Sequence, residues 1–148
     1  MAIPSILRSP PVVGLASLAA QRVLARGSTS PGTSALGAAV AVAGVALMGA
    51  GIRQIRSAGT TLDPMHPEGA TALVRDGIFR HSRNPIYLGD ALLLTGHAIH
   101  RRDLLALLPV AVFVGVIDLL QIPEEEAAML ATFGSRYGDY VATVRRWF

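Results

Sequence analysis

Two short segments hold the residues best suited to chemistry, the turn Arg83-Asn84-Pro85-Ile86-Tyr87 and the run Glu124-Glu125-Glu126. Pro85 disfavours helical backbone at Asn84 and suits the first position of a helix, so the sequence predicts a helix that begins at Pro85 with Asn84 as its N-cap. A helix start offers free N–H groups, and with Arg83 beside it the turn could receive a carboxylate or a phosphate. A simple capped membrane helix with an interfacial tyrosine and arginine fits the same residues.

The three glutamates follow Pro123 and begin a predicted amphipathic helix that breaks near Gly134 and then resumes. Carboxylates in a first turn complement the helix dipole, which is one sufficient explanation for them. The functional alternative is that one or two point into a cleft. There they would accept hydrogen bonds from sugar hydroxyls or an ammonium group.

Four apolar blocks must position these segments. Residues 35–52 and 104–122 are long enough to span a bilayer, whereas 10–25 and 86–99 are shorter or interrupted by polar residues. The sequence thus predicts an all-α fold, a small polytopic membrane bundle of about four transmembrane helices with a cytoplasmic interfacial C-terminal helix. The block after Arg8 also resembles a signal peptide, but another long apolar block follows it almost at once.

Small residues recur at helical spacing in the block 35–52 and predict a face on which a neighbouring helix packs closely. This face is formed by Ala35, Ala39 and Ala43, with Ala46 and Ala50 adjoining. Asp118 lies within the block 104–122, and a carboxylate at that depth needs a partner, a wet cavity or the interface.

The arginines predict the orientation of the bundle. With four spans, nine arginines lie on the side of the termini and four on the other, so the termini and segment 53–85 are expected in the cytoplasm. The nine are Arg8, Arg53, Arg56, Arg75, Arg80, Arg83, Arg136, Arg145 and Arg146, and the four are Arg22, Arg26, Arg101 and Arg102.

The composition excludes several kinds of chemistry. The chain has no cysteine, which excludes a thiolate nucleophile and cysteine-ligated metals, and no metal site is expected. All 13 basic residues are arginine, which excludes a Schiff-base lysine. A net charge of +3 without basic runs does not indicate nucleic-acid binding.

The run 77–89, followed by Ile122-Pro123-Glu124-Glu125-Glu126 and the segment 133–140, resembles the isoprenylcysteine carboxyl methyltransferase family. The wider group includes bacterial phospholipid methyltransferase-like membrane proteins. The resemblance covers residue 57 to the end and implies a single membrane domain over 1–148. Residues 1–56 would form its N-terminal two-helix part and 57–148 its cofactor-binding part.

The resemblance implies an enzyme of the bacterial inner membrane that uses S-adenosylmethionine on the cytoplasmic side and methylates a lipophilic small molecule or lipid. The cofactor-binding positions would be Gly77, Phe79, Arg83, Asn84, Pro85, Tyr87, Glu125 and Glu126, with Arg83 and Glu126 also catalytic. The family often has histidine where Asn84 stands, so a histidine-dependent role is not carried over. His81, His97, His100 and the glutamates stay open as candidate bases.

Two other functions remain open at the level of the sequence. Membrane sterol-type reductases have a similar Arg-x-Pro-x-Tyr turn, which makes an NADPH-dependent reductase of a lipid double bond the alternative enzyme. The third interpretation is a non-catalytic helical scaffold in which the arginines and glutamates form interfacial ion pairs. The sequence names neither the methyl acceptor nor the oligomeric state.

Overall fold

The computed structural model describes residues 9–148, and this part of the chain contains helices and no β-strand. The main helices are α1 (Pro10–Leu24), α2 (Pro31–Ser57), α3 (Pro85–Arg101), α4 (Leu108–Val116), α5 (Ile122–Phe133) and α6 (Ser135–Thr143). Short 3₁₀ turns are η2 (Pro67–Gly69), η3 (Gly77–Arg80) and η4 (Leu104–Leu107), and a π-helical turn, η5 (Ile117–Gln121), joins α4 to α5. The all-α fold class predicted from the sequence is confirmed.

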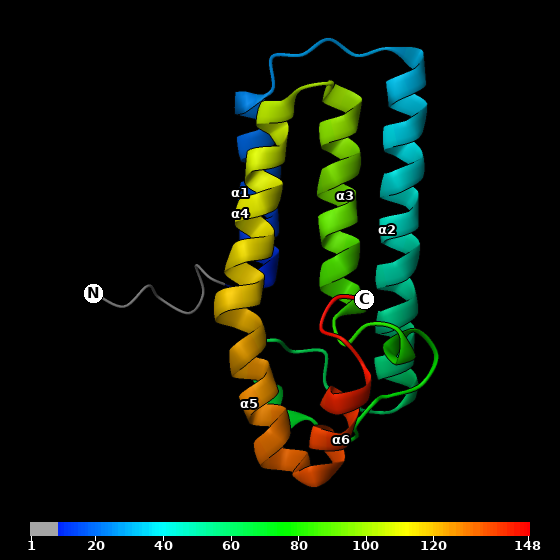
Figure 1. Cartoon of the computed structure of the whole chain (residues 1–148), viewed down its shortest axis with the longest axis vertical. Helices are drawn as coiled ribbons and strands as arrows, with labels where there is room; N and C mark the ends of the chain where they lie inside the picture. The colour runs from blue at the N-terminus through cyan, green and yellow to red at the C-terminus, as the bar shows by residue number, and fades with distance from the viewer. Residues whose placement is uncertain (1–8) are drawn as a thin grey trace, which may run out of the picture.

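The first four helices run side by side as an elongated bundle in which α3 lies between α2 and the pair α1 and α4 (Figure 1). The segment Leu104–Phe133 forms one helical rod of 30 residues, and its α5 end projects beyond the other helices. There α6 turns back towards the bundle. All four apolar blocks of the sequence are therefore helical, as predicted.

Within residues 9–148, two helical segments are long and apolar enough to cross a membrane, α2 and Leu104–Phe133. Helices α1 and α3 contain 15 and 17 residues, which is shorter than the roughly 20 of a typical span. The structure thus supports two candidate spans and does not clearly give the predicted four. Arg8, used in the charge count, lies outside the described residues.

Glycines bring α2 and α3 together. The buried residues of α2 are Gly37, Gly44 and Gly51, spaced by seven. A Cβ added to Gly44 would lie 2.5 Å from the carbonyl oxygen of Gly89, and one added to Gly37 would lie 2.4 Å from that of Gly96. The two backbones are therefore in direct contact, which no larger residue permits.

The predicted packing face of α2 was wrong. Ala35, Ala39, Ala43 and Ala46 are exposed, and Ala50 is only partly buried. The glycine face packs against α3 because glycine lets the α3 backbone approach more closely than alanine does. Alanine is equally suitable on a face that points outward.

Gln21 fastens α1 to its neighbours from a fully buried position. Its amide nitrogen donates to the carbonyl oxygens of Leu94 at 2.9 Å and Ala106 at 2.8 Å, and its oxygen lies 3.0 Å from Nδ1 of His97. Because every polar atom of the amide has a partner, the polar interruption of this apolar block is a link between three elements.

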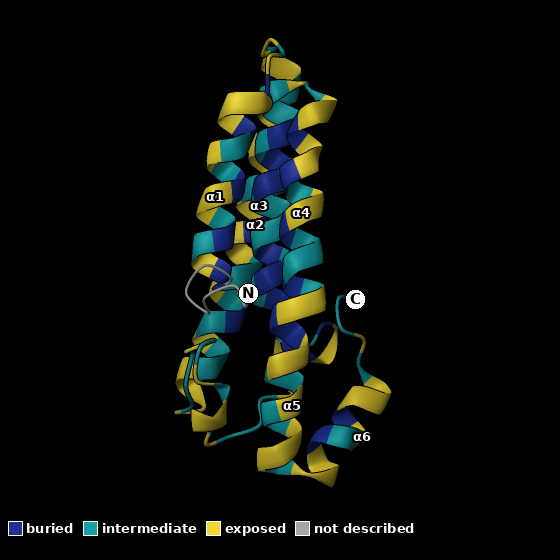
Figure 2. Ribbon diagram, turned by 90° about the vertical axis from the view of Figure 1, so that its left-hand side faces the viewer, coloured by how far each residue is buried: buried dark blue, intermediate teal, exposed yellow. Residues whose placement is uncertain are grey.

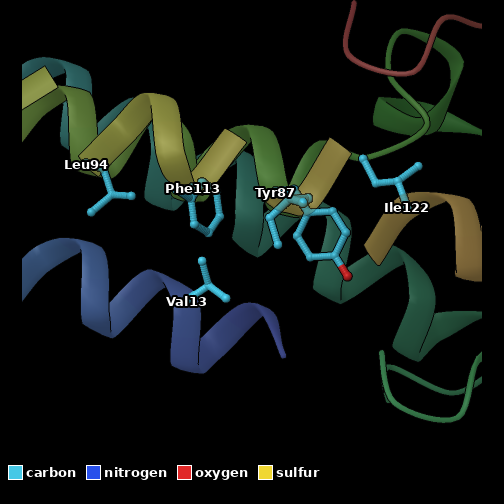
Figure 3. Packing of buried hydrophobic residues seen from close by; sticks show 6 residues of the cluster. Val13, Tyr87, Leu94, Phe113 and Ile122 are labelled. Carbon is cyan, nitrogen blue, oxygen red and sulfur yellow. The ribbon is translucent and has the colours of Figure 1, made fainter. Parts of the chain in front are cut away.

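The apolar core connects the bundle to the end where α5 begins. Figure 3 shows Val13, Tyr87, Leu94, Phe113 and Ile122 converging from α1, α3, α4 and α5, with Ile117 completing the cluster. Tyr87 and Ile122 belong to the two segments that the sequence singled out, so core packing brings these segments together.

Beyond the bundle, η3 packs against α6 through Phe79, Tyr137 and Tyr140. The predicted break in the C-terminal helix is confirmed at Gly134, whose φ of +56° separates α5 from α6. Figure 2 shows that burial follows the inward faces of the helices and that exposed residues occupy much of their outward faces.

Candidate active site

A cavity of about 500 Å³ lies where α3 and α5 begin. Its walls come from the start of α1, the second half of α2, the segment 60–74, and α3, α5 and α6. Apolar side chains dominate this lining, among them Met48, Ile52, Leu73, Ile122 and Met129. Both the size and the apolar walls are typical of a small-molecule site.

Seven of the eight predicted site residues line this cavity: Phe79, Arg83, Asn84, Pro85, Tyr87, Glu125 and Glu126. Gly77 is not among the lining residues. Its φ is +55°, and a Cβ there would overlap the amide of Gln54. Gln54 holds the turn by donating to the Asp76 carbonyl and accepting from Ile78 N–H, each at 3.0 Å.

Arg83 is the buried cation of the cavity. Its side chain is 10% exposed, and Nη2 lies 3.2 Å from Oε1 of Glu126. Its Nε and Nη1 atoms are buried without a hydrogen-bond partner within residues 9–148. A buried guanidinium with two open donors is suited to receive a carboxylate or another anion, because leaving those donors unsatisfied is costly.

Asn84 occupies the predicted N-cap position of α3, but its side chain makes no capping hydrogen bond. Its amide instead donates to the carbonyl oxygen of Arg146 at 3.0 Å, and Arg83 N–H donates to that of Arg145 at 3.1 Å. The capping role was therefore wrong. The C-terminal segment competes for the amide and anchors the turn through it.

Glu125 accepts hydrogen bonds from the Tyr87 hydroxyl and from the Gln121 amide, the latter at 2.8 Å. Gln121 also donates to the carbonyl oxygen of Pro64 at 2.8 Å. Through Gln121, Glu125 is thus linked to the segment 60–74, which lines the cavity. The π-helical turn that ends at Gln121 aims this side chain, and such turns are frequent at functional sites.

Glu126 joins two arginines. Besides Arg83, it accepts from Arg146, whose Nη2 lies 2.7 Å from Oε2. Arg146 also bonds Asp118 Oδ1 at 3.1 Å, and the Trp147 indole donates to the same oxygen at 2.9 Å. The partner that the sequence required for Asp118 is therefore present.

Sequence reasoning missed several residues of the site. Arg146 had no spacing signal that pointed to the glutamates. Asp90 lines the cavity and was visible only as an interruption of an apolar block. Tyr137 and Tyr140 line it from α6, and Tyr140 donates to the Phe79 carbonyl at 2.7 Å. Burial and the neighbouring Glu126 raise the pKa of the Tyr137 phenol to about 12 against the opposing effect of the nearby Arg83 guanidinium.

The histidines considered as bases lie away from this cavity. His81 is exposed, His97 bonds Gln21, and Nδ1 of His100 lies 3.1 Å from the Ser34 hydroxyl. Glu124 is also exposed and is not among the lining residues. The cavity therefore offers open guanidinium donors, three carboxylates on its α3 and α5 walls and aromatic surfaces.

Comparison with known proteins identifies the group to which the chain belongs. Over 62 residues it is 37% identical to an uncharacterized protein of Haemophilus influenzae, a match that covers 42% of this chain and 98% of that protein. No solved structure matches it significantly. Residues 33–136, from α2 into α6, match the phospholipid methyltransferase family. This match includes the Arg83 turn and the glutamates and spans more than half of the chain, which therefore belongs to the phospholipid methyltransferase family.

Proposed function

We propose that this chain is an integral membrane enzyme that transfers a methyl group from S-adenosylmethionine to a lipophilic, membrane-associated acceptor. One observation carries the proposal. Arg83 is buried in a largely apolar cavity with two open donor atoms, next to Glu125 and Glu126. Membership of a methyltransferase family gives this arrangement its reaction class.

The residues of the cavity fit the functional groups of the cofactor. Its α-carboxylate matches the open Nε and Nη1 donors of Arg83. Its ammonium and ribose hydroxyls match the glutamate oxygens, and the faces of Tyr87 and Tyr137 suit its sulfonium. When bound, the cofactor supplies an electrophilic methyl group.

The chain itself must align the reactants and exclude water. Arg83 and Glu126 orient the cofactor's charged end, and Arg146 holds Glu126 in place from the other side. Tyr87 and Gln121 hold Glu125, while the link from Gln121 to Pro64 keeps the segment 60–74 over the cavity. Phe79, Asn84 and Pro85 build the adjoining wall.

We also propose that α1 and α3 lie in the bilayer with the two longer spans, with the site on the cytoplasmic face. Large apolar side chains are exposed on α1, α2 and the 104–133 rod, among them Leu15, Val42, Leu104 and Val112. Such outward apolar faces are stable against lipid tails. The excess of arginine at the end that holds the site supports the orientation.

Calorimetric titration of the purified protein in detergent tests the proposed function. We expect S-adenosylhomocysteine to bind with micromolar affinity, about −8 kcal/mol, and NADPH to give no heat. Heat with NADPH alone would replace the methyltransferase by the lipid reductase. No heat with either nucleotide would favour the non-catalytic scaffold.

A further inference from the structure

Asp90 is a carboxylate on the bundle side of the cavity. It lies on α3 one turn beyond Tyr87 and is partly buried. It lies five positions after Pro85, which is about 7.5 Å along a helix, so it lies deeper in the bundle than the start of α3 where Arg83 is held. Most of the cavity residues contributed by α1 and α2 are apolar, among them Pro10, Met48 and Ile52, and Arg56 of α2 also lines the cavity.

Among the residues that the structure describes, Asp90 differs from the other carboxylates of the cavity in having no hydrogen-bond or ion-pair partner. Glu125 is held by Tyr87 and Gln121, Glu126 by two arginines, and Asp63 by His66 at 2.8 Å. Within residues 9–148, no hydrogen bond or ion pair satisfies the oxygens of Asp90. A partly buried carboxylate among apolar side chains calls for a hydrogen-bond donor or a cation.

We propose that Asp90 binds the methyl acceptor and selects an acceptor that carries an N–H or O–H group over one that presents a carboxylate. The inference rests on the proposed function and divides the cavity in two. Arg83, Glu125 and Glu126 hold the cofactor at one end, and Asp90 receives the acceptor at the other. An acceptor carboxylate would place a second negative charge beside Asp90, which has no ion-pair partner within residues 9–148.

The same carboxylate serves the reaction as the proton acceptor. An ammonium group bound to Asp90 transfers one proton to the carboxylate and regains its lone pair. That lone pair forms the N–C bond to the methyl group while the S–C bond breaks, and the bonding electrons remain on sulfur. A methylated ammonium and a neutral thioether result, and the proton on Asp90 returns to water. A hydroxyl acceptor loses its proton to Asp90 in the same way as the O–C bond forms.

A second cavity gives the apolar part of an acceptor a path along the same helices. It measures about 300 Å³, and its lining combines apolar residues such as Leu18, Ala41 and Leu93 with Ser34, His97 and His100. Asp90 lies on α3 between this cavity and the turn that holds Arg83. An acceptor whose polar head reaches Asp90 would extend its hydrocarbon chain along α3 towards this second cavity.

Three probes with the same chain length and different heads test the assignment: decylamine, decanol and decanoate. Each is titrated calorimetrically into protein in phosphatidylcholine nanodiscs saturated with S-adenosylhomocysteine, and the heats from empty nanodiscs are subtracted. The variants are Asp90→Asn, Asp90→Glu and, as a matched control, Asp139→Asn, which changes an exposed carboxylate of α6.

We expect the unchanged protein and the Asp139→Asn control to prefer decylamine and decanol to decanoate. Asp90→Asn should bind decylamine at least tenfold more weakly, because a charge-assisted hydrogen bond is lost, and should lose the discrimination against decanoate. Asp90→Glu should restore part of the preference. The affinity for S-adenosylhomocysteine should stay within twofold in every variant, which also reports that they are folded.

Preference for decanoate in the unchanged protein, absence of decylamine binding, or equal selectivity with and without the Asp90 carboxylate would overturn the assignment. So would a large loss of S-adenosylhomocysteine affinity in Asp90→Asn, because it would place Asp90 at the cofactor end. If the unchanged protein bound no S-adenosylhomocysteine at all, the proposed function itself would fail, an outcome distinct from the others.

Discussion

Two donor atoms of the Arg83 guanidinium are available to bind a ligand. Nη2 is engaged by Glu126, while the buried Nε and Nη1 have no partner within the described residues. Changing Arg83→Gln should weaken binding of S-adenosylhomocysteine by about 1.5–3 kcal/mol, at least tenfold, as expected for lost charge-assisted hydrogen bonds. Stability should fall less than for an orphaned ion pair, because Glu126 keeps Arg146. Calorimetry and thermal unfolding measure the two effects.

The exposed Arg136 of α6 is the matched control for this change. Arg136→Gln removes the same charge from outside the cavity and should leave ligand affinity within twofold. Equal affinities of the two variants would remove Arg83 from the binding site.

Substitution of three neighbouring glutamates distinguishes a role in ligand binding from a role in stabilising the helix dipole. Glu125→Gln and Glu126→Gln should each weaken S-adenosylhomocysteine binding by about 1.5–3 kcal/mol, because both carboxylates line the cavity. Glu124→Gln changes an exposed residue outside the lining and should alter stability by at most about 1 kcal/mol, with affinity unchanged. Calorimetry on the three single variants is sufficient. Equal losses at all three positions, or at none, would contradict the assignment.

At the residue scale, seven of the eight residues predicted from the sequence line the cavity, because the local sequence marks the two segments that carry most of them. A proline after a polar residue marks the start of α3, and the glutamates follow a second proline. Arg146 could not be predicted in the same way, since it reaches Glu126 only through the fold of the C-terminal segment. The role of Asn84 was wrong for the same reason, as its amide bonds the Arg146 carbonyl.

At the scale of the elements, the contact of α2 with α3 depends on glycine at particular positions. A Cβ at Gly44 would lie 2.5 Å from the Gly89 carbonyl oxygen, whereas one at Gly49 has nothing within 4 Å. Gly44→Ala should therefore destabilise the protein by about 1–3 kcal/mol through overpacking. Gly49→Ala should be neutral or stabilise by up to about 1 kcal/mol, because alanine is the better helix former. Thermal unfolding in one detergent compares the two.

These variants introduce the same methyl group on the same helix five residues apart. A common effect of detergent or of helix propensity therefore cancels between them. Equal melting temperatures of Gly44→Ala and Gly49→Ala would show that the two helices are not in close contact at Gly44.

The helices themselves were predictable from apolar blocks, but the face that each one buries was not. In α2 every candidate face carries small or apolar residues, and hydropathy does not distinguish a face in contact with protein from one in contact with lipid. The close backbone contacts at Gly37 and Gly44 show which face of α2 packs against α3. The π-helical turn at Ile117–Gln121 was likewise invisible, because it arises from one extra residue in the helix and has no composition signal.

At the scale of the whole molecule, the proposed orientation predicts which ends of the bundle face the same compartment. Helix α2 is 27 residues long, about 40 Å at 1.5 Å per residue, so its two ends reach opposite sides of a bilayer if it spans one. Ser57 ends α2 and Ser135 begins α6, both at the site end, whereas Ser28 lies in the connection between α1 and α2. All three are exposed, and the chain has no native cysteine to confuse labelling.

Single changes Ser57→Cys, Ser135→Cys and Ser28→Cys, each labelled with a membrane-impermeant maleimide, test this orientation. In intact bacterial cells only Ser28→Cys should react, because it lies at the end opposite the site. In inverted membrane vesicles Ser57→Cys and Ser135→Cys should react together and Ser28→Cys should not. Labelling of Ser57→Cys and Ser135→Cys from opposite sides would refute the four-span arrangement, since it would place the start of the glutamate segment and the end of α2 in different compartments. Labelling of both in intact cells, with Ser28→Cys protected, would keep the arrangement and reverse its orientation, and the excess of arginine at the site end would then need another explanation.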